Sequence, residues 1–276
     1  MTHNPDRTAK LQVFRALHER PGLFLIPNPW DAGSARILTA LGFEALATTS
    51  AGFAFSAGHK DGVAAMTRAR ILANAKEIVE ATHLPVSADM EDGFGTSPEA
   101  CAQTIHLATE AGLAGGSIED ATGDPSNPIY ELQLSVERIA AAGEAARKHG
   151  FVLTARAENF LHGKSDLANT IKRLQAYEQA GADVLYAPGL PSLEAVREVC
   201  SSVSKPVNVL MGLQGATYSV EEIAAAGAKR ISVGGSLART AYGALFRAAR
   251  EMKENGSFKY AGEAVSHKEI TGLMRG

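Results

Sequence analysis

Apolar positions recur along the chain in one repeated arrangement, an amphipathic stretch followed by a short apolar run. Several of these stretches end at a small or aliphatic residue followed by glycine, at Leu41-Gly42, Ala111-Gly112, Ala180-Gly181 and Ala226-Gly227. A glycine just past a helix end takes the left-handed conformation without a Cβ penalty, so these pairs predict helix C-termini. The run after each pair is too short for a helix and suits a strand buried on both faces.

Applied to the whole chain, this pattern predicts eight strands separated by helices. The strands are expected at Leu23–Ile26, Ala45–Thr48, Val86–Asp89, Gly116–Ile118, Val152–Arg156, Val184–Ala187, Val207–Leu210 and Ile231–Val233. The clearest helices are Ala69–Ala81 and Leu167–Ala180, with apolar residues at three- and four-residue spacing. Strict alternation implies parallel pairing, and eight units in about 250 residues match a (β/α)₈ TIM barrel. An open doubly wound sheet is the alternative, but no GxGxxG follows the first strand.

Two further helices are expected outside the eight repeats. Residues 5–20 predict an extra helix before the first strand, and Thr240–Glu254 predict the helix after the last one. No segment rich in proline, glycine or serine divides the chain. We therefore expect a single barrel domain over residues 1–276.

Composition and charge narrow the classes of function. The chain has 276 residues, a net charge of −3 and two cysteines, Cys101 and Cys200, without metal-ligand spacing. A weakly acidic chain has no basic face for nucleic acid, and no run of about 18 apolar residues predicts a membrane span. No signal peptide is recognisable at the N-terminus. Two distant cysteines suit a reducing compartment, so we expect a cytoplasmic protein without nucleic-acid or membrane partners.

Acidic residues gather where the first five predicted strands end. They are Asp31, Asp61, Asp89, Glu91, Asp92, Glu119, Asp120 and Glu158. In barrels of this kind the chemistry lies at the C-terminal ends of the strands. Several carboxylates in one barrel mouth repel one another unless a cation lies among them. Mg²⁺, a hard cation that takes oxygen ligands and keeps several waters, is the natural partner.

A functional role is not expected equally for all of these acidic residues. Asp31 and Asp120 could equally cap a following helix, where the helix dipole favours a negative charge. For Asp89 and Glu119, each at the end of an apolar strand, a functional role is favoured. Asp89 and Glu91 form the strongest pair, because alternation along an extended strand would place both side chains on one face.

Other polar residues near the strand ends are candidates for binding a substrate. Arg156 could clamp a carboxylate with two hydrogen bonds, or pair with Glu119 or Glu158 instead. The turn Thr49-Ser50-Ala51-Gly52 offers hydroxyls and N–H groups for a carboxylate or enolate oxygen, or is an ordinary turn. Asn208, beside the seventh strand, is a further substrate-binding candidate. Trp30 could line a pocket or simply pack, and His59 is expected in a solvated loop.

Several motifs together resemble the isocitrate lyase/phosphoenolpyruvate mutase superfamily. They are Trp30-Asp31-Ala32-Gly33-Ser34-Ala35-Arg36, Thr49-Ser50-Ala51-Gly52, Ser87-Ala88-Asp89-Met90-Glu91-Asp92-Gly93-Phe94-Gly95, Ser117-Ile118-Glu119-Asp120, Thr154-Ala155-Arg156 and Ser232-Val233-Gly234-Gly235-Ser236. The resemblance covers nearly the whole chain. It implies a (β/α)₈ barrel and a homo-oligomer, a dimer or a tetramer, with the helix after the eighth strand exchanged between subunits.

The resemblance also implies roles for individual residues. It makes Asp89 the direct Mg²⁺ ligand, with Mn²⁺ as an alternative ion, and lets Asp61, Glu91 and Glu119 reach the metal mainly through water. Ser50, Ala51 and Gly52 would hold an oxygen of a pyruvate-like group. Trp30, Asp31 and Asn208 would contact the substrate, and Asp61, Glu119 and Arg156 would act in catalysis. Family members make or break a C–C or P–C bond beside a 2-oxo acid, and Mg²⁺ stabilises the resulting enolate.

One loop departs from the family pattern. Lyases of the family carry a Lys-Lys-Cys-Gly-His loop after the fourth strand, whose cysteine transfers a proton. Residues 119–130 hold no lysine, cysteine or histidine, although residues 121–130 still have the composition of a flexible lid.

Three functions remain open. The first is a Mg²⁺-dependent lyase or decarboxylase acting on a small 2-oxo or 2-hydroxy carboxylate such as oxaloacetate, because decarboxylation tolerates the missing cysteine best. The second is P–C bond chemistry on a phosphonate, and the third is a catalytically idle protein that binds 2-oxo acids.

Overall fold

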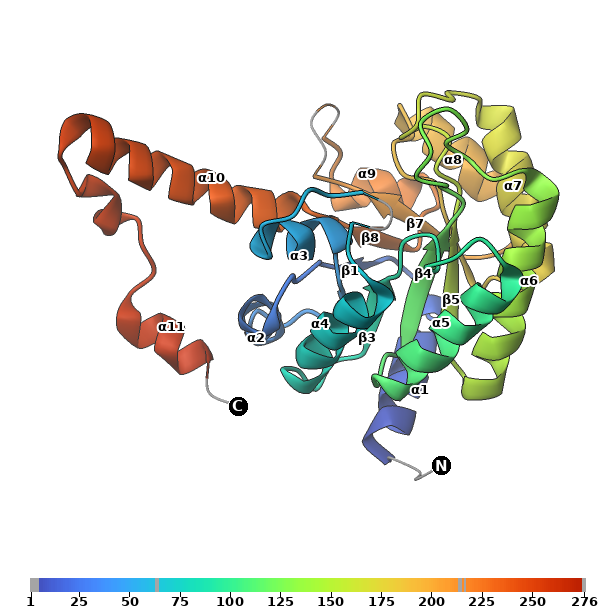
Figure 1. Ribbon diagram of the computed structural model, residues 1–276, viewed down its shortest axis with the longest axis horizontal. Helices are drawn as coiled ribbons and strands as arrows, with labels where there is room; N and C mark the ends of the chain where they lie inside the picture. Colours follow the sequence, from blue (N-terminus) through green and yellow to red (C-terminus); the bar gives the residue numbers. More distant parts are fainter. Residues whose placement is uncertain (1–4, 63–64, 213–214, 216, 275–276) are drawn as a thin grey trace.

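Eight parallel strands lie at the centre of the chain in the computed structural model, which describes residues 5–62, 65–212, 215 and 217–274 (Figure 1). Within these residues the strands are β1 (Phe24–Ile26), β2 (Leu46–Ala47), β3 (Val86–Asp89), β4 (Gly115–Glu119), β5 (Val152–Arg156), β6 (Val184–Tyr186), β7 (Val207–Leu210) and β8 (Arg230–Ser232).

The strand order is that of a TIM barrel. Neighbouring strands pair in the order β1-β8-β7-β6-β5-β4-β3-β2, and every pairing is parallel. Between β1 and β2, the N–H of Ala47 donates to the carbonyl oxygen of Pro27 at 3.0 Å. This bond joins the two ends of the sheet, and the predicted fold is confirmed.

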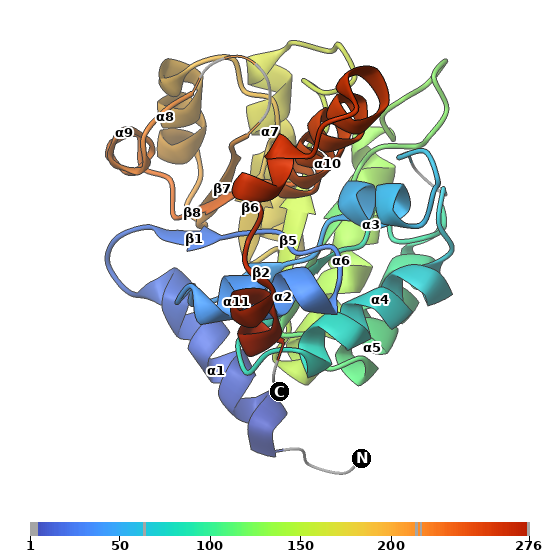
Figure 2. The ribbon, with the colours of Figure 1, turned by 90° about the vertical axis from the view of Figure 1, so that its left-hand side faces the viewer.

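Helices surround the barrel and extend beyond it (Figures 1 and 2). They are α1 (Pro5–Glu19), α2 (Ala32–Ala40), α3 (Ser50–Ser56), α4 (Arg68–Glu80), α5 (Pro98–Glu110), α6 (Leu132–His149), α7 (Leu167–Ala180), α8 (Leu193–Ser202), α9 (Val220–Ala225), α10 (Ser236–Arg250), the short turns η1 (Glu251–Asn255) and η2 (Lys259–Gly262), and α11 (His267–Leu273). Helix α10 projects away from the barrel, and α11 returns beside α2. Among the described helices, none combines the length and the apolar character needed to cross a membrane.

The hydrophobic pattern located the repeated units accurately. Strands β3, β5 and β7 and helix α7 have the predicted bounds, and the remaining strands differ by one or two residues at their ends. The glycines predicted to follow helix ends all have positive φ, at 85° for Gly42, 88° for Gly112, 109° for Gly181 and 96° for Gly227. Left-handed glycine therefore does end these helices.

The C-terminal region differs more from expectation. Helix α10 begins at Ser236, four residues before the predicted start, and passes at Glu251 into the π-helical turn η1. Helices α3 and α11 were not predicted, since seven residues each are too few for a helical period to stand out. Leu245, Phe246 and Phe258 of this region are exposed.

Helix α1 closes the end of the barrel where the strands begin. Phe14 and Leu17 are buried there with Phe24 and Val184. A Cβ atom at Gly115 of β4 would lie 2.6 Å from the ring of Phe14 and 2.8 Å from the carbonyl oxygen of Val152. Only glycine therefore allows α1 to pack this closely against the strands.

His18 on α1 makes the stability of this closure depend on pH. Its ring lies edge-on to Phe14 and Phe24, with centroids 4.8 and 5.0 Å apart. Burial, and after it the charge of Arg230, lowers the pKa of His18 from 6.5 to about 3. In the unfolded chain, His18 binds a proton below pH 6.5, whereas in the native state it stays neutral down to about pH 3. The native state therefore loses stability relative to the unfolded chain as the pH falls from 6.5 to about 3.

We expect His18→Gln to remove this loss. Below pH 6.5 the wild-type free energy of unfolding should fall, relative to the variant, by up to about 1.4 kcal/mol per pH unit. Urea unfolding of both proteins at neutral pH and near pH 5 measures the difference. Parallel pH profiles would contradict it. His83→Gln, which changes a histidine on the exposed surface, serves as the control.

Candidate active site

A cavity of about 300 Å³ opens at the C-terminal ends of the strands. Side chains from all eight strand ends and from the start of α10 surround it. Its lining residues are Asn28, Ala47, Thr48, Thr49, Ser50, Ala51, Phe55, Asp61, Ser87, Ala88, Asp89, Ser117, Arg156, Tyr186, Asn208, Leu210, Arg230, Ser232, Gly234, Gly235 and Arg239. The structure therefore brings six of the predicted site residues to one cavity, namely Ser50, Ala51, Asp61, Asp89, Arg156 and Asn208.

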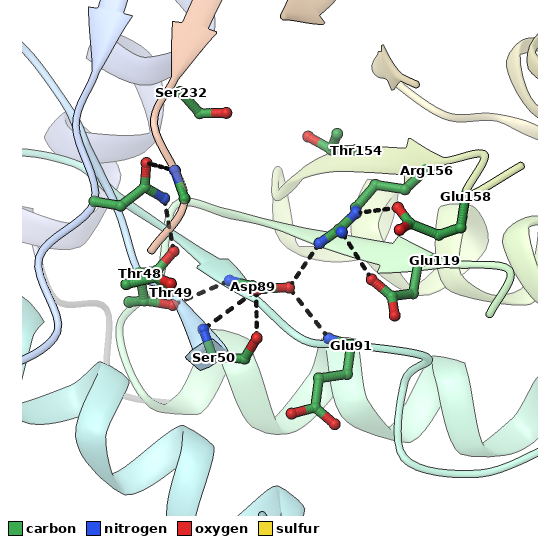
Figure 3. A network of polar contacts seen from close by, with 12 residues as sticks. Thr48, Thr49, Ser50, Asp89, Glu91, Glu119, Thr154, Arg156, Glu158 and Ser232 are labelled. Atoms are coloured by element: carbon green, nitrogen blue, oxygen red, sulfur yellow. Dashed lines mark hydrogen bonds and ion pairs between the residues drawn. The ribbon is translucent and has the colours of Figure 1, made fainter. Parts of the chain in front are cut away.

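Asp89 lies at the end of β3 and is held by donors from two other segments (Figure 3). Its Oδ2 accepts hydrogen bonds from the Ser50 hydroxyl at 2.8 Å and the Ser50 N–H at 3.2 Å. Its Oδ1 accepts from Arg156 Nη1 at 2.9 Å. These contacts fix the orientation of the carboxylate in the cavity wall.

Arg156 contacts three carboxylates at once. Its Nη1 lies 2.9 Å from Asp89, its Nη2 3.0 Å from Glu119 and its Nε 2.8 Å from Glu158 (Figure 3). The guanidinium also lies 5.1 Å from the centre of the Tyr186 ring. Both ion pairs weighed from the sequence, with Glu119 and with Glu158, are present, and Asp89 forms a third.

Two of these three carboxylates, Glu119 and Glu158, have raised pKa values, chiefly because they are buried. Burial raises the pKa of Glu119 well above its usual value; Arg156 opposes the shift, while the nearby Glu158 and Asp89 add to it. Burial likewise raises the pKa of Glu158 against the same opposition. Arg156 stays charged, since the carboxylates outweigh the effect of burial on its pKa. The cluster is short of positive charge.

Asp61 and Glu91 add to this negative charge. Although Asp61 is exposed, desolvation against the cavity wall and, after it, the charge of Asp89 raise the pKa of its carboxyl. Glu91 is buried and acts electrostatically on Glu119. Within residues 5–62, 65–212, 215 and 217–274, no three acidic, histidine or cysteine side chains converge closely enough to bind a metal by themselves.

The predicted turn Thr49–Gly52 is the first turn of α3. The Thr49 hydroxyl accepts from the N–H of Gly52 at 3.2 Å and caps the helix. A Cβ atom at Gly52 would lie 2.7 Å from Thr49 Cγ2, 3.0 Å from Trp30 Cβ and 3.2 Å from Ala238 Cβ. Gly52 therefore permits close packing below the cavity, while Ser50 uses both of its donors to orient Asp89.

The segment after β3 has an unusual backbone. Glu91 and Phe94, neither of them glycine, have φ values of 47° and 60°. Such left-handed residues are strained and persist only where their surroundings hold them. Arg138 does so by donating to the carbonyl oxygens of Gly95 at 2.6 Å, Thr96 at 2.8 Å and Asp92.

This backbone corrects the argument that paired Asp89 with Glu91. Strand alternation requires an extended chain, but β3 ends at Asp89 and Glu91 is left-handed. The same-face rule therefore does not apply. Instead, the N–H of Glu91 approaches Asp89 Oδ1 at 3.4 Å, and a metal-binding role for Glu91 stays a prediction.

Asp31 and Trp30 have structural contacts outside the cavity lining. Asp31 caps α2, accepting from the Ser34 N–H at 2.7 Å and the Ser34 hydroxyl at 2.7 Å. The carbonyl oxygen of Trp30 accepts from Asn74 at 3.0 Å. A contact of either residue with substrate stays a prediction. His59 is exposed, as expected, and its Nε2 lies 3.1 Å from Arg70 Nη1.

Several lining residues were not identified from the sequence. Asn28 links three strand ends, since its amide donates to Thr48 O at 2.9 Å and its oxygen accepts from the N–H groups of Val233 and Gly234 at 2.8 and 3.0 Å. Asn28 directly follows the first predicted strand, as Asp89 ends the third, so the same positional rule could have found it.

Tyr186 and Arg230 were also overlooked. Tyr186 was treated as part of an apolar strand, and Arg230 was left outside its strand because that strand was predicted to begin at Ile231. Arginine beside a buried strand was the available signal, because a buried charge needs a partner or a function.

The loop after β4 is held at its base. Ala121 and Ile129 form an antiparallel bridge, and the N–H of Thr122 donates to Pro128 O at 2.9 Å. Asp120, beneath the loop, accepts from the Tyr177 hydroxyl at 2.6 Å and from Arg173 at 3.1 Å. Asp120 thus serves neither the cavity nor a helix N-terminus, and residues 123–127 at the loop tip are exposed.

Comparison with known proteins places the chain among enzymes. Residues 14–253 match the family described as phosphoenolpyruvate phosphomutase. The 2-methylisocitrate lyase of Escherichia coli is 28% identical over 81% of this chain and 76% of its own. A crystal structure described as a lyase/mutase from Burkholderia cenocepacia is 54% identical, covers 99% of this chain and 98% of that one, and has a TM-score of 0.96. A 2,3-dimethylmalate lyase is 25% identical over 98% and 95% of the two chains, with a TM-score of 0.85.

Proposed function

The chain belongs to the phosphoenolpyruvate phosphomutase family of the isocitrate lyase/phosphoenolpyruvate mutase superfamily, and we propose that it is a Mg²⁺-dependent lyase or decarboxylase. It cleaves a C–C bond next to a small 2-oxo or 2-hydroxy carboxylate, and the reaction proceeds through a pyruvate-type enolate. Its relatives are lyases and mutases that act on small carboxylates.

One observation carries this proposal, the charge imbalance around Arg156. Asp89, Glu119 and Glu158 contact a single guanidinium, and burial raises the pKa of Glu119 and Glu158. Asp61 and Glu91 act electrostatically on this cluster. Carboxylates at such density favour a bound cation.

The donor set fits a hydrated Mg²⁺. All the candidate ligands are carboxylate oxygens, and Mg²⁺ is commonly held by one or two carboxylates while it keeps several waters. Asp89, fixed by Ser50, would be the direct ligand, with Asp61, Glu91 and Glu119 reached through water; Mn²⁺ fits the same donors. When bound, the ion supplies Lewis-acid stabilisation of an enolate oxygen.

The protein's own residues then orient the substrate. Arg156, held in one orientation by three carboxylates, lines the cavity and can donate a hydrogen bond from its remaining N–H groups to a substrate oxygen; Asn208 and the start of α3 line the same cavity. Burial raises the pKa of Tyr186, so its phenol stays protonated and can donate a hydrogen bond, not the proton itself, toward developing negative charge.

The loop after β4 favours decarboxylation over aldol-type cleavage. Residues 119–130 lack the lysine, cysteine and histidine of the lyase loop. Loss of CO₂ needs no protein acid during bond breaking, whereas cleavage of a hydroxy acid needs a base to accept its hydroxyl proton. Oxaloacetate is therefore the first substrate to test.

A substrate panel tests the proposal. Purified protein with Mg²⁺ should release pyruvate from oxaloacetate or from another small 2-oxo or 2-hydroxy acid. The pyruvate is measured with lactate dehydrogenase as the coupling enzyme. Chelation of the metal should stop the release, and restored Mg²⁺ should recover it. If no acid in the panel yields product above a control that contains Mg²⁺ but no protein, the proposed function is wrong.

A second candidate is P–C bond chemistry on a small phosphonate. It requires cationic groups beyond Arg156 for the extra charge, and Arg239 and Arg230 line the same cavity. Phosphate release or ³¹P NMR with phosphonopyruvate separates this reaction from the first. If the protein binds oxalate but turns over neither the panel of 2-oxo and 2-hydroxy acids nor phosphonopyruvate, it is instead a catalytically inactive protein that binds 2-oxo acids.

The exposed C-terminal region supports a homo-oligomer, a dimer or a tetramer, in which α10 is exchanged between subunits. Leu245, Phe246 and Phe258 are each at least 60% exposed, and apolar residues grouped in this way usually mark an interface. Light scattering should give a mass at least twice the 29.0 kDa of one chain. A monomeric mass at working concentrations would contradict this arrangement.

A further inference from the structure

Arg230 places a positive charge at the inner end of the active-site cavity. It begins β8, is only 4% exposed, and belongs to the cavity lining. Around it, the inward positions of β3, β4, β7 and β8 carry the polar residues Ser87, Ser117, Asn208 and Ser232, all buried. The barrel interior here is polar and hollow, although the sequence predicted apolar strands.

The guanidinium of Arg230 donates its hydrogen bonds to uncharged side chains. Its Nε donates to Asn208 Oδ1 at 2.8 Å, and its Nη2 donates to Thr154 Oγ1 at 3.0 Å. Its Nη1 lies 3.2 Å from His18 Nε2. Because His18 Nδ1 lies 2.8 Å from the carbonyl oxygen of Phe14, Nδ1 must carry the ring proton, and Nε2 accepts from Arg230 as a neutral imidazole.

This environment differs from that of the other buried arginines. Arg156 has three carboxylate partners and Arg173 has Asp120. Arg138 has no ion pair either, but it lies outside the cavity lining and donates to three backbone carbonyl oxygens. Arg230 lines the cavity and has no carboxylate within 4.0 Å among the residues that the structure describes. Burial lowers the pKa of Arg230 to about 10, so it stays charged at neutral pH. An uncompensated buried charge is costly, and an apolar residue of similar size is often as stable or more so. The charge therefore calls for a functional explanation.

We propose that Arg230 is the counter-charge for the substrate, and that it makes the cavity select doubly charged small acids over singly charged ones. The inference rests on the proposed function only in taking the ligand to be a small carboxylate. Arg156 cannot supply this charge, since three carboxylates already surround it. Arg239 also lines the cavity, but it is exposed and solvent screens it. Arg230 is the buried cation of the described lining whose charge is not neutralised by the protein.

The test compares two ligands of nearly equal shape. Oxalate carries two negative charges, and oxamate carries one because an amide replaces a carboxylate. Their dissociation constants are measured in the presence of Mg²⁺ by calorimetry and by the fluorescence of Trp30, the single tryptophan, for the wild type and Arg230→Met. We expect the preference for oxalate to fall roughly tenfold or more in the variant, because a unit charge acts over several ångströms in a medium of low dielectric constant.

The affinity for Mg²⁺ provides a second measurement, because it should not fall with the affinity for anions. Removal of a cation near the carboxylates should leave Mg²⁺ binding unchanged or tighter while anion binding weakens, and general damage to the site would weaken both. Arg197→Met, which removes an equal charge from the exposed surface of α8, is the matched control and should keep the wild-type preference. Arg230→Lys, which keeps the charge, should retain most of the preference.

The outcomes are separable. If the wild type binds oxalate with Mg²⁺ but Arg230→Met keeps the same ratio of oxalate to oxamate affinity, the role of Arg230 is wrong and the proposed function stands. If the wild type binds neither ligand, the proposed function itself is wrong. Should Arg230→Met fail to fold, Arg230→Gln, which can still bond to Asn208, carries the same measurement.

Discussion

Replacing Asp89 with alanine should abolish metal binding and lower turnover at least about a thousandfold, equivalent to about 4 kcal/mol of lost transition-state stabilisation. Asp89 is the carboxylate that both Ser50 donors and Arg156 hold in place, so no other acid of the cluster is oriented in the same way. An ion that acts as a Lewis acid contributes several kcal/mol to the stabilisation of developing charge, and its loss removes that contribution entirely.

The fold should survive this substitution. Without Asp89, Arg156 still has Glu119 and Glu158 as partners, so no buried charge is left uncompensated. Calorimetric titration with Mg²⁺, or electron paramagnetic resonance with Mn²⁺, measures the metal, and thermal unfolding verifies the structure. Glu110→Gln, which changes an exposed carboxylate on α5, should bind metal normally. An Asp89→Ala protein that is folded and retains wild-type metal affinity would overturn the ligand assignment.

The sequence placed Asp89 and Arg156 correctly because their positions follow from a local rule. The end of each apolar run defines where the strand ends, and parallel strands in a barrel bring all such ends to one rim. Nothing beyond the order of residues is needed for that step. The same reasoning brought Asp61 and Ser50 to the cavity lining.

What the residues do at the rim depended on contacts between distant segments. Ser50 was expected to offer free donors to a substrate, but it lies against Asp89, 39 positions away, and both of its donors are used there. Arg230 contacts Asn208 because β7 and β8 pair in one register, and a shift by one residue would separate them. Strands β7 and β8 are buried on both faces, so their hydrophobic pattern leaves the register open, and neither contact was accessible from the sequence.

Local backbone geometry also limited how much of the site could be predicted from the sequence. Glu91 takes a left-handed conformation that its residue type disfavours, and Arg138, 47 positions later, binds the carbonyl groups that hold this segment. A rule based on extended strands cannot anticipate such a turn. Strained residues of this kind collect at functional sites, which agrees with the place of Glu91 two residues after the proposed metal ligand Asp89.

Replacing Arg156 with methionine should cause the largest loss of stability, about 3–5 kcal/mol in the absence of metal, because it leaves buried carboxylates without their counter-ion. Asp89, Glu119 and Glu158 all contact this one guanidinium, and each of these side chains is less than one-fifth exposed. Substrate turnover should be lost as well, since the same group faces the cavity.

The pH dependence of this loss has a definite sign. Folding raises the pKa of Glu119 and Glu158 above the usual 4.5, and removal of Arg156 takes away the charge that opposes the rise. The native state of the variant then binds protons more tightly than the unfolded chain does. Its stability is therefore greatest near or below pH 4.5 and is lost as the pH rises through the raised values.

Urea unfolding of Arg156→Met and the wild type, near pH 5 and near pH 8, with and without Mg²⁺, measures both effects. We expect the deficit of the variant to grow with pH, and Mg²⁺ to reduce it, because the ion can neutralise part of the same negative cluster. Arg156→Lys, which keeps a charge but cannot reach three carboxylates at once, should lie between the two. A deficit that is independent of pH and unaffected by Mg²⁺ would show that packing of the arginine side chain, and not its charge, stabilises the rim.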